Sequence, residues 1–478
     1  MPKPNLLFLF TDEQRQDTMA AYGNQLIQAP HLDRLASEGV VFTRAYVSQP
    51  VCTPSRATIM TGLYPHTCGC TANNIPLDES IPTLAELFAD PEYEHAYLGK
   101  WHLGDEIFPQ HGFTRWVSIE DAYRRHYRPP RDRQANCDYF HWLKRQGVEP
   151  DVEQEGWQAY SRGRAASLPA ELSKPAFLAE ETSRFLAERG DRPFVAYVNF
   201  LEPHMPFTGP YNDRYDPAQV PLPDNFYAPP HPDEPRRVSL IREHYRQRGF
   251  GAVELGTEAG WRRLTVNYWG LVTLVDEAVG RILAALEACG QADRTIVVFT
   301  SDHGDMMGSH RLLAKTVMFE EAVKVPLVMR LPGVRPHRVD SPTSQVDLVP
   351  TLLDLLGQPV PEGLQGASLR PRLEGRGEPE GEAFIEWNGR DSDEQLSDPG
   401  SPKAEAARLS GARARCVIAP DGWKLNLSEA DKCELYHLPS DPGETRNLYY
   451  SGEQGAVIAR LRERIRRWQE RTGDTAQV

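Results

Sequence analysis

Long hydrophobic runs are scarce in this chain, and their scarcity limits where the protein can act. No stretch of the 478 residues approaches the roughly 20 apolar residues that cross a membrane. The opening residues, MPKPNLLFLFTDEQ, hold a short apolar run with no small-residue cleavage site after it. We therefore expect no signal peptide and no membrane span, and we interpret residues 5–11 as a buried strand.

Positive charge is also in deficit, because 53 Lys and Arg residues face 67 Asp and Glu residues, for a formal net charge of −14. This balance argues against nucleic acid and anionic membranes as partners.

Cysteines are few and odd in number, and two of the seven, Cys68 and Cys70, lie too close in the sequence for an easy disulfide bridge. We therefore expect a reduced, cytoplasmic protein.

The apolar runs that are present are short and fit strands of a buried parallel sheet. Helical periodicity lies between them, most clearly over residues 268–288. This alternation predicts an α/β fold with a large, mainly parallel sheet sandwiched by helices. Two segments rich in Arg, Pro and aromatic residues, 120–165 and 205–262, are interpreted as excursions that recognise a substrate. The predicted strands cover residues 5–11, 96–99, 193–200, 295–300 and 325–331.

The character of the chain changes after about residue 375. Residues 388–406 are polar and predict a loop, and residues 413–427 predict a hairpin. We predict an α/β catalytic domain over 1–375 and a smaller α+β domain over 376–478, with an antiparallel sheet and a terminal helix. One face of that amphipathic helix carries Val457, Leu461, Ile465 and Trp468.

Polar, reactive residues directly follow four of the predicted strands. Because ligands of open α/β sheets lie outside the carboxyl ends of the strands, we expect these residues to meet at one edge. Carboxylates there would suit Ca²⁺ or Mg²⁺, a histidine nitrogen favours Mn²⁺, and cations and proton donors would suit an oxyanion. Each residue alone is explained as well by a helix cap or a structural histidine, so the prediction rests on their convergence. They are Asp12, Glu13, Lys100, His102, His204, Asp302 and His303.

Residues 50–62, PVCTPSRATIMTG, predict a helix with Cys52 at its N-terminus, Pro54 in its first turn and Gly62 at its end. The helix dipole would stabilise negative charge on Cys52. Arg56 opposes that dipole, which points to a functional or tertiary partner. An ordinary buried cysteine remains an alternative for Cys52. Lys315, on a polar connection between two strands, is either a surface lysine or a site residue.

CTPSRATIMTG also matches the C-x-P-S-R motif, and the chain resembles the type I, formylglycine-dependent sulfatases of the alkaline-phosphatase-like superfamily. The resemblance runs from residue 5 to about 470 and implies a sulfuric ester hydrolase that cleaves a sulfate monoester to an alcohol and inorganic sulfate. In such enzymes a separate formylglycine-generating enzyme converts the motif cysteine to Cα-formylglycine. One hydroxyl of its gem-diol attacks sulfur, and the other allows sulfate to be expelled. Further matching stretches are TDEQR, APHLDRLASEGVVFTRAY, GKWHLG, PHMPF, SDHGDMMGSH and ELYHLPSDPGETRNL.

By matched position, the resemblance implies that a divalent metal, Ca²⁺ before Mn²⁺ or Mg²⁺, is held by Asp12, Glu13, Cys52, Asp302 and His303. It implies that Arg56 supports the gem-diol and that sulfate is bound by Lys100 and Lys315. It further implies that His102 is the base on the second hydroxyl and that His204, with Lys315, donates to the leaving oxygen. Two positions depart from the common pattern, because Glu13 stands where many members have Asp and His303 where many have Asn.

Two other functions stay open. One is a phosphonate or phosphate ester hydrolase of the same superfamily, and the other is a non-catalytic binding protein with an unmodified Cys52. The complete set of polar groups argues against the second. The substrate is expected to be a small anionic sulfate ester whose alcohol is a carbohydrate, an aryl or an alkyl group. Asn73 and Asn74 are candidates for facing it, and a homo-oligomer is also possible.

Overall fold

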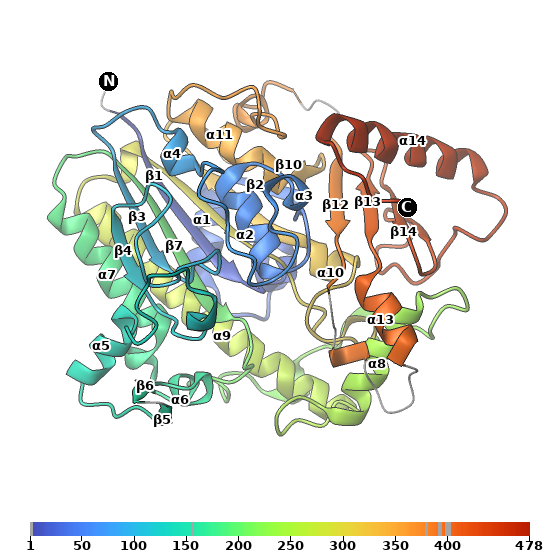
Figure 1. Ribbon diagram of the computed structural model, residues 1–478, viewed down its shortest axis with the longest axis horizontal. Coiled ribbons are helices and arrows are strands. Elements are labelled where there is room, and N and C mark those ends of the chain that lie inside the picture. The colour runs from blue at the N-terminus through green and yellow to red at the C-terminus, as the bar shows by residue number, and fades with distance from the viewer. Residues whose placement is uncertain (1–2, 155, 378–380, 391–393, 397–402) are drawn as a thin grey trace.

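The computed structural model describes residues 3–154, 156–377, 381–390, 394–396 and 403–478. Within these residues a nine-stranded sheet forms the centre of the molecule (Figure 1). Its strands are β1 (Asn5–Asp12), β2 (Val40–Tyr46), β3 (Glu94–Gly99), β4 (Arg115–Ser118), β7 (Phe194–Pro203), β8 (Thr295–Ser301), β9 (Lys324–Arg330), β10 (His337–Val339) and β11 (Thr343–Ser344). They lie in the order β10-β2-β9-β8-β1-β7-β3-β4, and β11 pairs with β2.

Four of the five predicted strands lie side by side and parallel, as β8, β1, β7 and β3. Their carboxyl ends therefore meet at one edge, as predicted. The fifth run, predicted at 325–331, forms β9, but β9 is antiparallel to both β8 and β2, so its predicted direction was wrong. An apolar run indicates that a strand is buried, but it does not indicate whether the strand is parallel or antiparallel to its neighbours. The connection over 302–323 returns the chain with only short helical turns, and antiparallel neighbours need no crossover helix.

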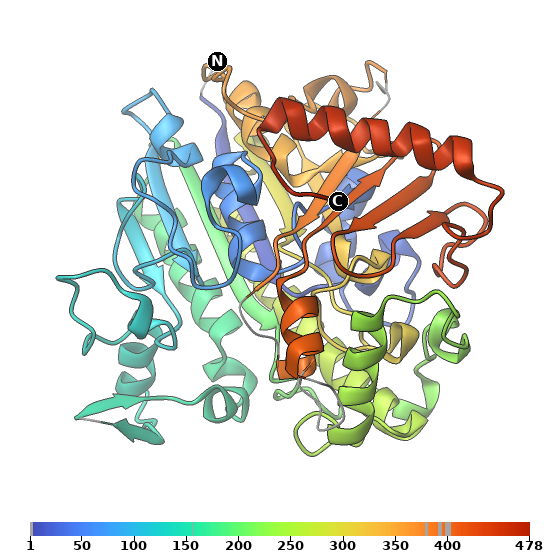
Figure 2. The ribbon, with the colours of Figure 1, turned by 45° about the vertical axis from the view of Figure 1, so that its right-hand side comes forward.

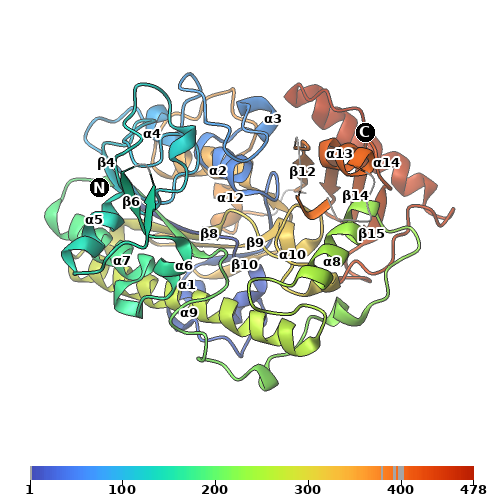
Figure 3. The ribbon, with the colours of Figure 1, turned by 60° about the horizontal axis from the view of Figure 1, so that its bottom comes forward.

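Helices cover both faces of this sheet, which confirms the predicted sandwich (Figure 3). The first face packs against α1 (Pro30–Glu38), α5 (Asp138–Arg145), α7 (Lys174–Glu188) and α9 (Glu258–Ala288). The second packs against α2 (Cys52–Thr61), α3 (Pro65–Cys68), α4 (Leu84–Leu87), α11 (Leu348–Leu355) and α12 (Arg370–Leu373). Helix α9 begins ten residues before the predicted start at residue 268.

A second, antiparallel sheet of four strands lies in the described C-terminal residues, with α14 (Gly455–Thr472) packed across it (Figure 2). Its strands are β12 (Ala383–Trp387), β13 (Ala414–Ile418), β14 (Trp423–Ser428) and β15 (Glu434–His437). The predicted hairpin is β13–β14, and the predicted terminal helix is α14. Of the loop predicted at 388–406, residues 391–393 and 397–402 lie outside the described residues, and α13 (Lys403–Gly411) begins within it.

The two long excursions carry secondary structure of their own, and parts of both line one small cavity beside His204. The first carries α5, the hairpin of β5 (Val152–Gln154) and β6 (Trp157–Ala159), and α6 (Arg162–Ala166). The second carries α8 (Arg236–Arg248) and the start of α9, and α10 (Glu320–Val323) lies just before β9. Across the described ranges, every helix is too short or too polar to cross a membrane.

Candidate active site

Helix α2 presents Cys52 to the edge where β1 and β8 end. It starts at Cys52 and ends before Gly62, whose left-handed backbone (φ 70°) caps it, so the predicted helix is confirmed. Cys52 Sγ lies 3.3 Å from His303 Nε2 and 3.7 Å from Asp12 Oδ1. The cysteine of the motif therefore lies among the polar residues that follow two different strands.

Asp12, Cys52, Asp302 and His303 form a buried group whose ligand atoms lie within 4.8 Å of one another. His303 Nδ1 donates to the Gly304 carbonyl at 2.9 Å, which leaves Nε2 to face the group. Burial lowers the pKa of His303, but Asp302 and Cys52 outweigh it and raise the pKa to about 9. The carboxylate oxygens and the imidazole Nε2 of this group are donor atoms that fit a divalent cation.

Arg56 is buried in the centre of the site and joins both aspartates. Its Nη2 donates to Asp12 Oδ2 at 2.8 Å, and its Nε donates to Asp302 Oδ2 at 2.9 Å. Its Nη1 donates to Asn199 Oδ1 at 2.7 Å and to the Lys100 carbonyl at 2.8 Å. These partners explain a cation in the first turn of α2, where the helix dipole disfavours it.

Lys100 is fully buried, and its Nζ contacts Asp12 Oδ2. Burial would raise the pKa of Asp12, but Lys100 and then His204 and Arg56 hold it well below its usual value. Burial lowers the pKa of Lys100, but Asp12 outweighs that effect and raises it. The pair is therefore ionised, with one carboxylate between two cations.

Glu13 belongs to a second group of possible ligand atoms, which shares Asp12 with the first group but does not include Cys52. Its Oε2 is 2.8 Å from Lys315 Nζ and 3.5 Å from His204 Nε2. It adopts a left-handed backbone (φ 70°), and His204 is the third member of the second group. Burial raises the pKa of Glu13 to about 8. Lys315 lowers this pKa and Asp305 raises it, so the effect of burial is only partly offset. Lys315 is thus a buried site residue, on the connection between β8 and β9.

His102 is held by its neighbours in one orientation. Its ring stacks on Tyr123 with the centroids 4.0 Å apart, and its Nε2 donates to Asn74 Oδ1 at 3.1 Å. Its Nδ1 therefore carries the lone pair, and this buried atom has no hydrogen-bond partner in the described part of the chain. Asn73 Oδ1 accepts the Thr53 amide of α2 at 3.0 Å. Both asparagines thus lie around the N-terminus of α2.

Several residues of the site were not predicted from the sequence. Asn199 interrupts the apolar run of β7, and Asp305 closes the SDHGD stretch, so both left a signal that could have been noticed. Tyr123 lies in an irregular excursion and left none. Asn199 accepts a hydrogen bond from Arg56, and Asp305 raises the pKa of Glu13. Tyr123 stacks on the ring of His102.

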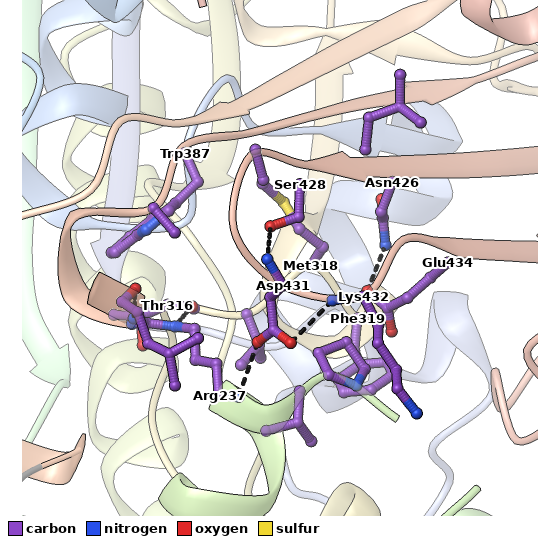
Figure 4. A pocket seen from close by; sticks show the side chains of 17 residues that line it. Arg237, Thr316, Met318, Phe319, Trp387, Asn426, Ser428, Asp431, Lys432 and Glu434 are labelled. Carbon is purple, nitrogen blue, oxygen red and sulfur yellow. Dashed lines mark hydrogen bonds between the residues drawn. The ribbon is translucent and has the colours of Figure 1, made fainter. Parts of the chain in front are cut away.

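A separate cavity of ≈ 70 Å³ lies between α8 and the C-terminal sheet (Figure 4). Arg237 lies in it with its guanidinium 4.8 Å from the centre of the Trp387 ring, and its Nε donates to the Thr316 carbonyl at 3.2 Å. The predicted site residues do not line this cavity, although Thr316 directly follows Lys315. This cavity is a small gap between packed elements and not the catalytic site.

The sheet order, the helices on both faces and the charged group at the carboxyl edge define a hydrolase of the alkaline-phosphatase-like superfamily. The family model described as Sulfatase matches residues 4–358. The chain therefore belongs to the sulfatase family, and it is an enzyme, a sulfatase.

Individual relatives match over nearly the whole chain. "Uncharacterized sulfatase YidJ" of Escherichia coli (strain K12) is 29% identical over 94% of this chain and 83% of its own length. "N-acetylglucosamine-6-O-sulfatase" of Bacteroides thetaiotaomicron is 27% identical over 99% of this chain and 88% of its own length. The solved phosphonate monoester hydrolase SpPMH of Silicibacter pomeroyi matches with a TM-score of 0.79 and 27% identity, covering 98% of this chain and 96% of that one.

Proposed function

We propose that this sulfatase hydrolyses a small anionic sulfate monoester through a formylglycine made from Cys52, with a divalent cation beside it. The observation that carries this proposal is the position of Cys52 Sγ, between Asp12 and His303 at the N-terminus of α2. A nucleophile at this point would lie next to two carboxylates, an imidazole and two buried lysines. A formylglycine-generating enzyme is the partner required for maturation.

Asp12, Asp302, His303 and the modified residue 52 would hold the cation, and Glu13 could reach it from the side of His204. Ca²⁺ is our first choice because carboxylate oxygens dominate the donor set, with Mn²⁺ or Mg²⁺ as alternatives. When bound, the cation would neutralise sulfate charge and lower the pKa of a hydroxyl nucleophile. The hydrated aldehyde at position 52 would supply two hydroxyls, one for attack on sulfur and one for release of sulfate.

The two lysines are suited to bind sulfate oxygens. Burial lowers the pKa of Lys315, but Glu13 outweighs this effect and raises it, so Lys315 stays protonated like Lys100. Both ammonium groups lie at buried positions, where a fixed charge stabilises a developing anion more strongly than in water.

The two histidines are suited to move protons. Burial and Lys100 hold the pKa of His102 well below its usual value, so its Nδ1 can accept a proton from the second hydroxyl. His204 Nδ1 donates to the Met205 carbonyl at 2.8 Å, which leaves Nε2 as the atom that faces Lys315 and Glu13. Burial and Lys315 hold the pKa of His204 well below its usual value, so this Nε2 carries the lone pair. We therefore assign the proton for the leaving oxygen to the protonated Lys315, with His204 Nε2 as the atom that relays it.

The test combines activity with chemical analysis of residue 52. Protein produced together with a formylglycine-generating enzyme should hydrolyse 4-nitrophenyl sulfate, and mass spectrometry of the peptide 45–64 should show the aldehyde. Cys52→Ala should abolish turnover without unfolding the protein, whereas Cys289→Ala, at a cysteine far along the chain in α9's C-cap, should not. Fully active protein with an unmodified thiol at Cys52 would overturn the proposed mechanism.

A second candidate is the hydrolysis of phosphonate or phosphate esters, and the similarity to SpPMH favours it. One site with a cation, two lysines and a diol would accept tetrahedral sulfur or phosphorus. Comparing kcat/KM for phenyl sulfate and a phenyl phosphonate monoester decides between the two. A large preference for the phosphonate would replace our first choice.

A further inference from the structure

A charged cluster beside His204 has no part in the mechanism above. Glu120 Oε2 accepts from Arg162 Nε at 3.2 Å and from Arg162 Nη2 at 2.9 Å, and its Oε1 contacts Lys174 Nζ. Burial would raise the pKa of Glu120, but Lys174 and Arg162 lower it to about 2, so the carboxylate is ionised. One carboxylate between two cations leaves the cluster with an excess positive charge.

The cluster lies at the catalytic site. Arg162, Lys174 and His204 line the same small cavity. Arg162 Nη2 also donates to the Tyr123 hydroxyl at 2.9 Å, and Tyr123 is the ring that stacks on His102. Arg162 is therefore connected to His102 through one residue, Tyr123, and it lines the same cavity as His204.

One nitrogen of the Arg162 guanidinium, Nη1, is left for a ligand. Its Nε and Nη2 are used by Glu120 and Tyr123, whereas its Nη1 has no hydrogen-bond partner among the residues that the structure describes. The Arg162 side chain is 31% exposed, although Glu120 beneath it is only 3% exposed. A buried carboxylate thus holds the Nε and Nη2 atoms and fixes the orientation of the guanidinium, with Nη1 left unpaired in the described part of the chain.

The size of the cavity limits the ligand. It measures ≈ 20 Å³, room for one or two water-sized groups and too little for a sugar ring. A carboxylate has oxygens of that size, and one of them can accept a charge-assisted hydrogen bond from Arg162 Nη1. Glu202 forms part of the wall, and its buried Oε2 has no hydrogen-bond partner among the residues that the structure describes.

We propose that Arg162 binds a carboxylate on the alcohol part of the substrate, so that the preferred substrates are sulfate esters of acidic alcohols, such as uronic acids or carboxylated phenols. This inference rests on the proposed function and narrows its substrate class. Arg162 would act as a specificity residue next to the leaving-group side of the site, where His204 lies.

The test uses a matched pair of substrates, carboxyphenyl sulfate and its carboxamide analogue, with the substituent at the 3 or 4 position. In the wild type, kcat/KM should be at least tenfold higher for the carboxylate, mainly through a lower KM. Arg162→Gln should reduce this ratio to near one, and Arg162→Lys should retain part of it. Arg164→Gln, two residues further along α6, is the matched control and should keep the wild-type ratio.

A wild-type ratio near one, or a ratio that survives Arg162→Gln, would overturn the inference. Lys174 still pairs Glu120 in Arg162→Gln, so the variant should fold, and turnover of the carboxamide reports an intact site. If the glutamine variant does not fold, the ratio in Arg162→Lys decides. Wild-type protein that hydrolyses neither sulfate would overturn the proposed function instead, and phosphonates of the same two phenols would then test the subsite.

Discussion

Arg56 shows how far single residues can be interpreted from the sequence. A cation in the first turn of α2 is locally unfavourable, which predicted a tertiary partner. The structure supplies Asp12 and Asp302, both brought from strand ends far along the chain. The helix position of Arg56 predicted that it has a partner, but it did not identify Asn199 as one of them. The contacts of Asn199 within its own strand do not explain why this residue is polar.

Arg56→Gln should therefore damage stability and activity together. The change leaves two buried carboxylates without their shared cation, and breaking a buried pair in this way costs about 3–5 kcal/mol. We expect a loss of that size in the free energy of unfolding by urea, and at least a hundredfold loss of kcat/KM for an aryl sulfate. Arg34→Gln, at a side chain 53% exposed in pairs with Glu38 and Glu287, should cost at most about 1 kcal/mol. Equal stability of the two variants would contradict this account.

The partners of Glu13 and Arg162 could not be predicted from the sequence. Glu13 follows β1 directly, and its type indicated a metal ligand, but its left-handed backbone turns it towards Lys315 and His204. Arg162 belongs to an excursion with many arginines, and no local pattern distinguishes it from Arg164. Contacts across large sequence separations decide these roles, and only the fold reveals them.

At the level of elements, apolar runs predicted the four central strands because strands covered on both faces are apolar throughout. The same reasoning missed β2, whose Thr43 and Arg44 interrupt the run. It also gave β9 the wrong direction, because direction depends on the connection and not on the strand. The start of α9 was placed late, since its first turns pack against an excursion and not against the sheet.

Gly99 links element packing to the site, because it ends β3 immediately before Lys100. Its φ is 124°, and a Cβ there would lie 1.9 Å from the carbonyl oxygen of Asn199 in β7. Gly99→Ala should force the two strands apart, cost at least about 2 kcal/mol in unfolding free energy, and reduce activity by moving Lys100 and Asn199. Thermal unfolding and kcat/KM measure the two effects.

Gly69→Ala is the matched control for this substitution. Gly69 also has a left-handed backbone (φ 80°), but nothing lies within 4 Å of an added Cβ. Only the backbone cost of about 1–2 kcal/mol should remain, with activity per folded molecule preserved. If the two alanine variants behaved alike, close approach of β3 and β7 would not be what requires Gly99.

At the scale of the whole molecule, a buried ionic network joins the C-terminal sheet to the large sheet. Lys424 of β14 lies with its Nζ 3.0 Å from Glu320 and 2.8 Å from Glu444. Glu320 also accepts from the Tyr46 hydroxyl of β2 at 3.0 Å, and its amide donates to Glu444 at 2.6 Å. The predicted domain boundary near residue 375 stays a prediction. This network could not be foreseen, because its members belong to β2, α10, β14 and the loop between β15 and α14.

Lys424→Met should show whether this network also supports the catalytic site. The variant leaves Glu444 buried without a lysine and leaves Glu320 with only Lys324, 3.2 Å away, so we expect a loss of about 3–5 kcal/mol in unfolding free energy. Lys432→Met, at a lysine 42% exposed and paired with Asp233, should cost at most about 1 kcal/mol. Glu320 comes five residues after Lys315, so the loss of Lys424 should also lower turnover in the protein that remains folded.

Adding Glu444→Gln to Lys424→Met separates these two effects, because it removes one of the stranded carboxylates. Stability should recover in part. If turnover recovers with it, the C-terminal sheet holds the segment that carries Lys315, and the two sheets act as one catalytic unit. If stability recovers while turnover stays low, Lys424 itself positions the segment through Glu320. Turnover at the wild-type level in Lys424→Met would contradict both interpretations. The network would then only join the two sheets and would have no effect on catalysis.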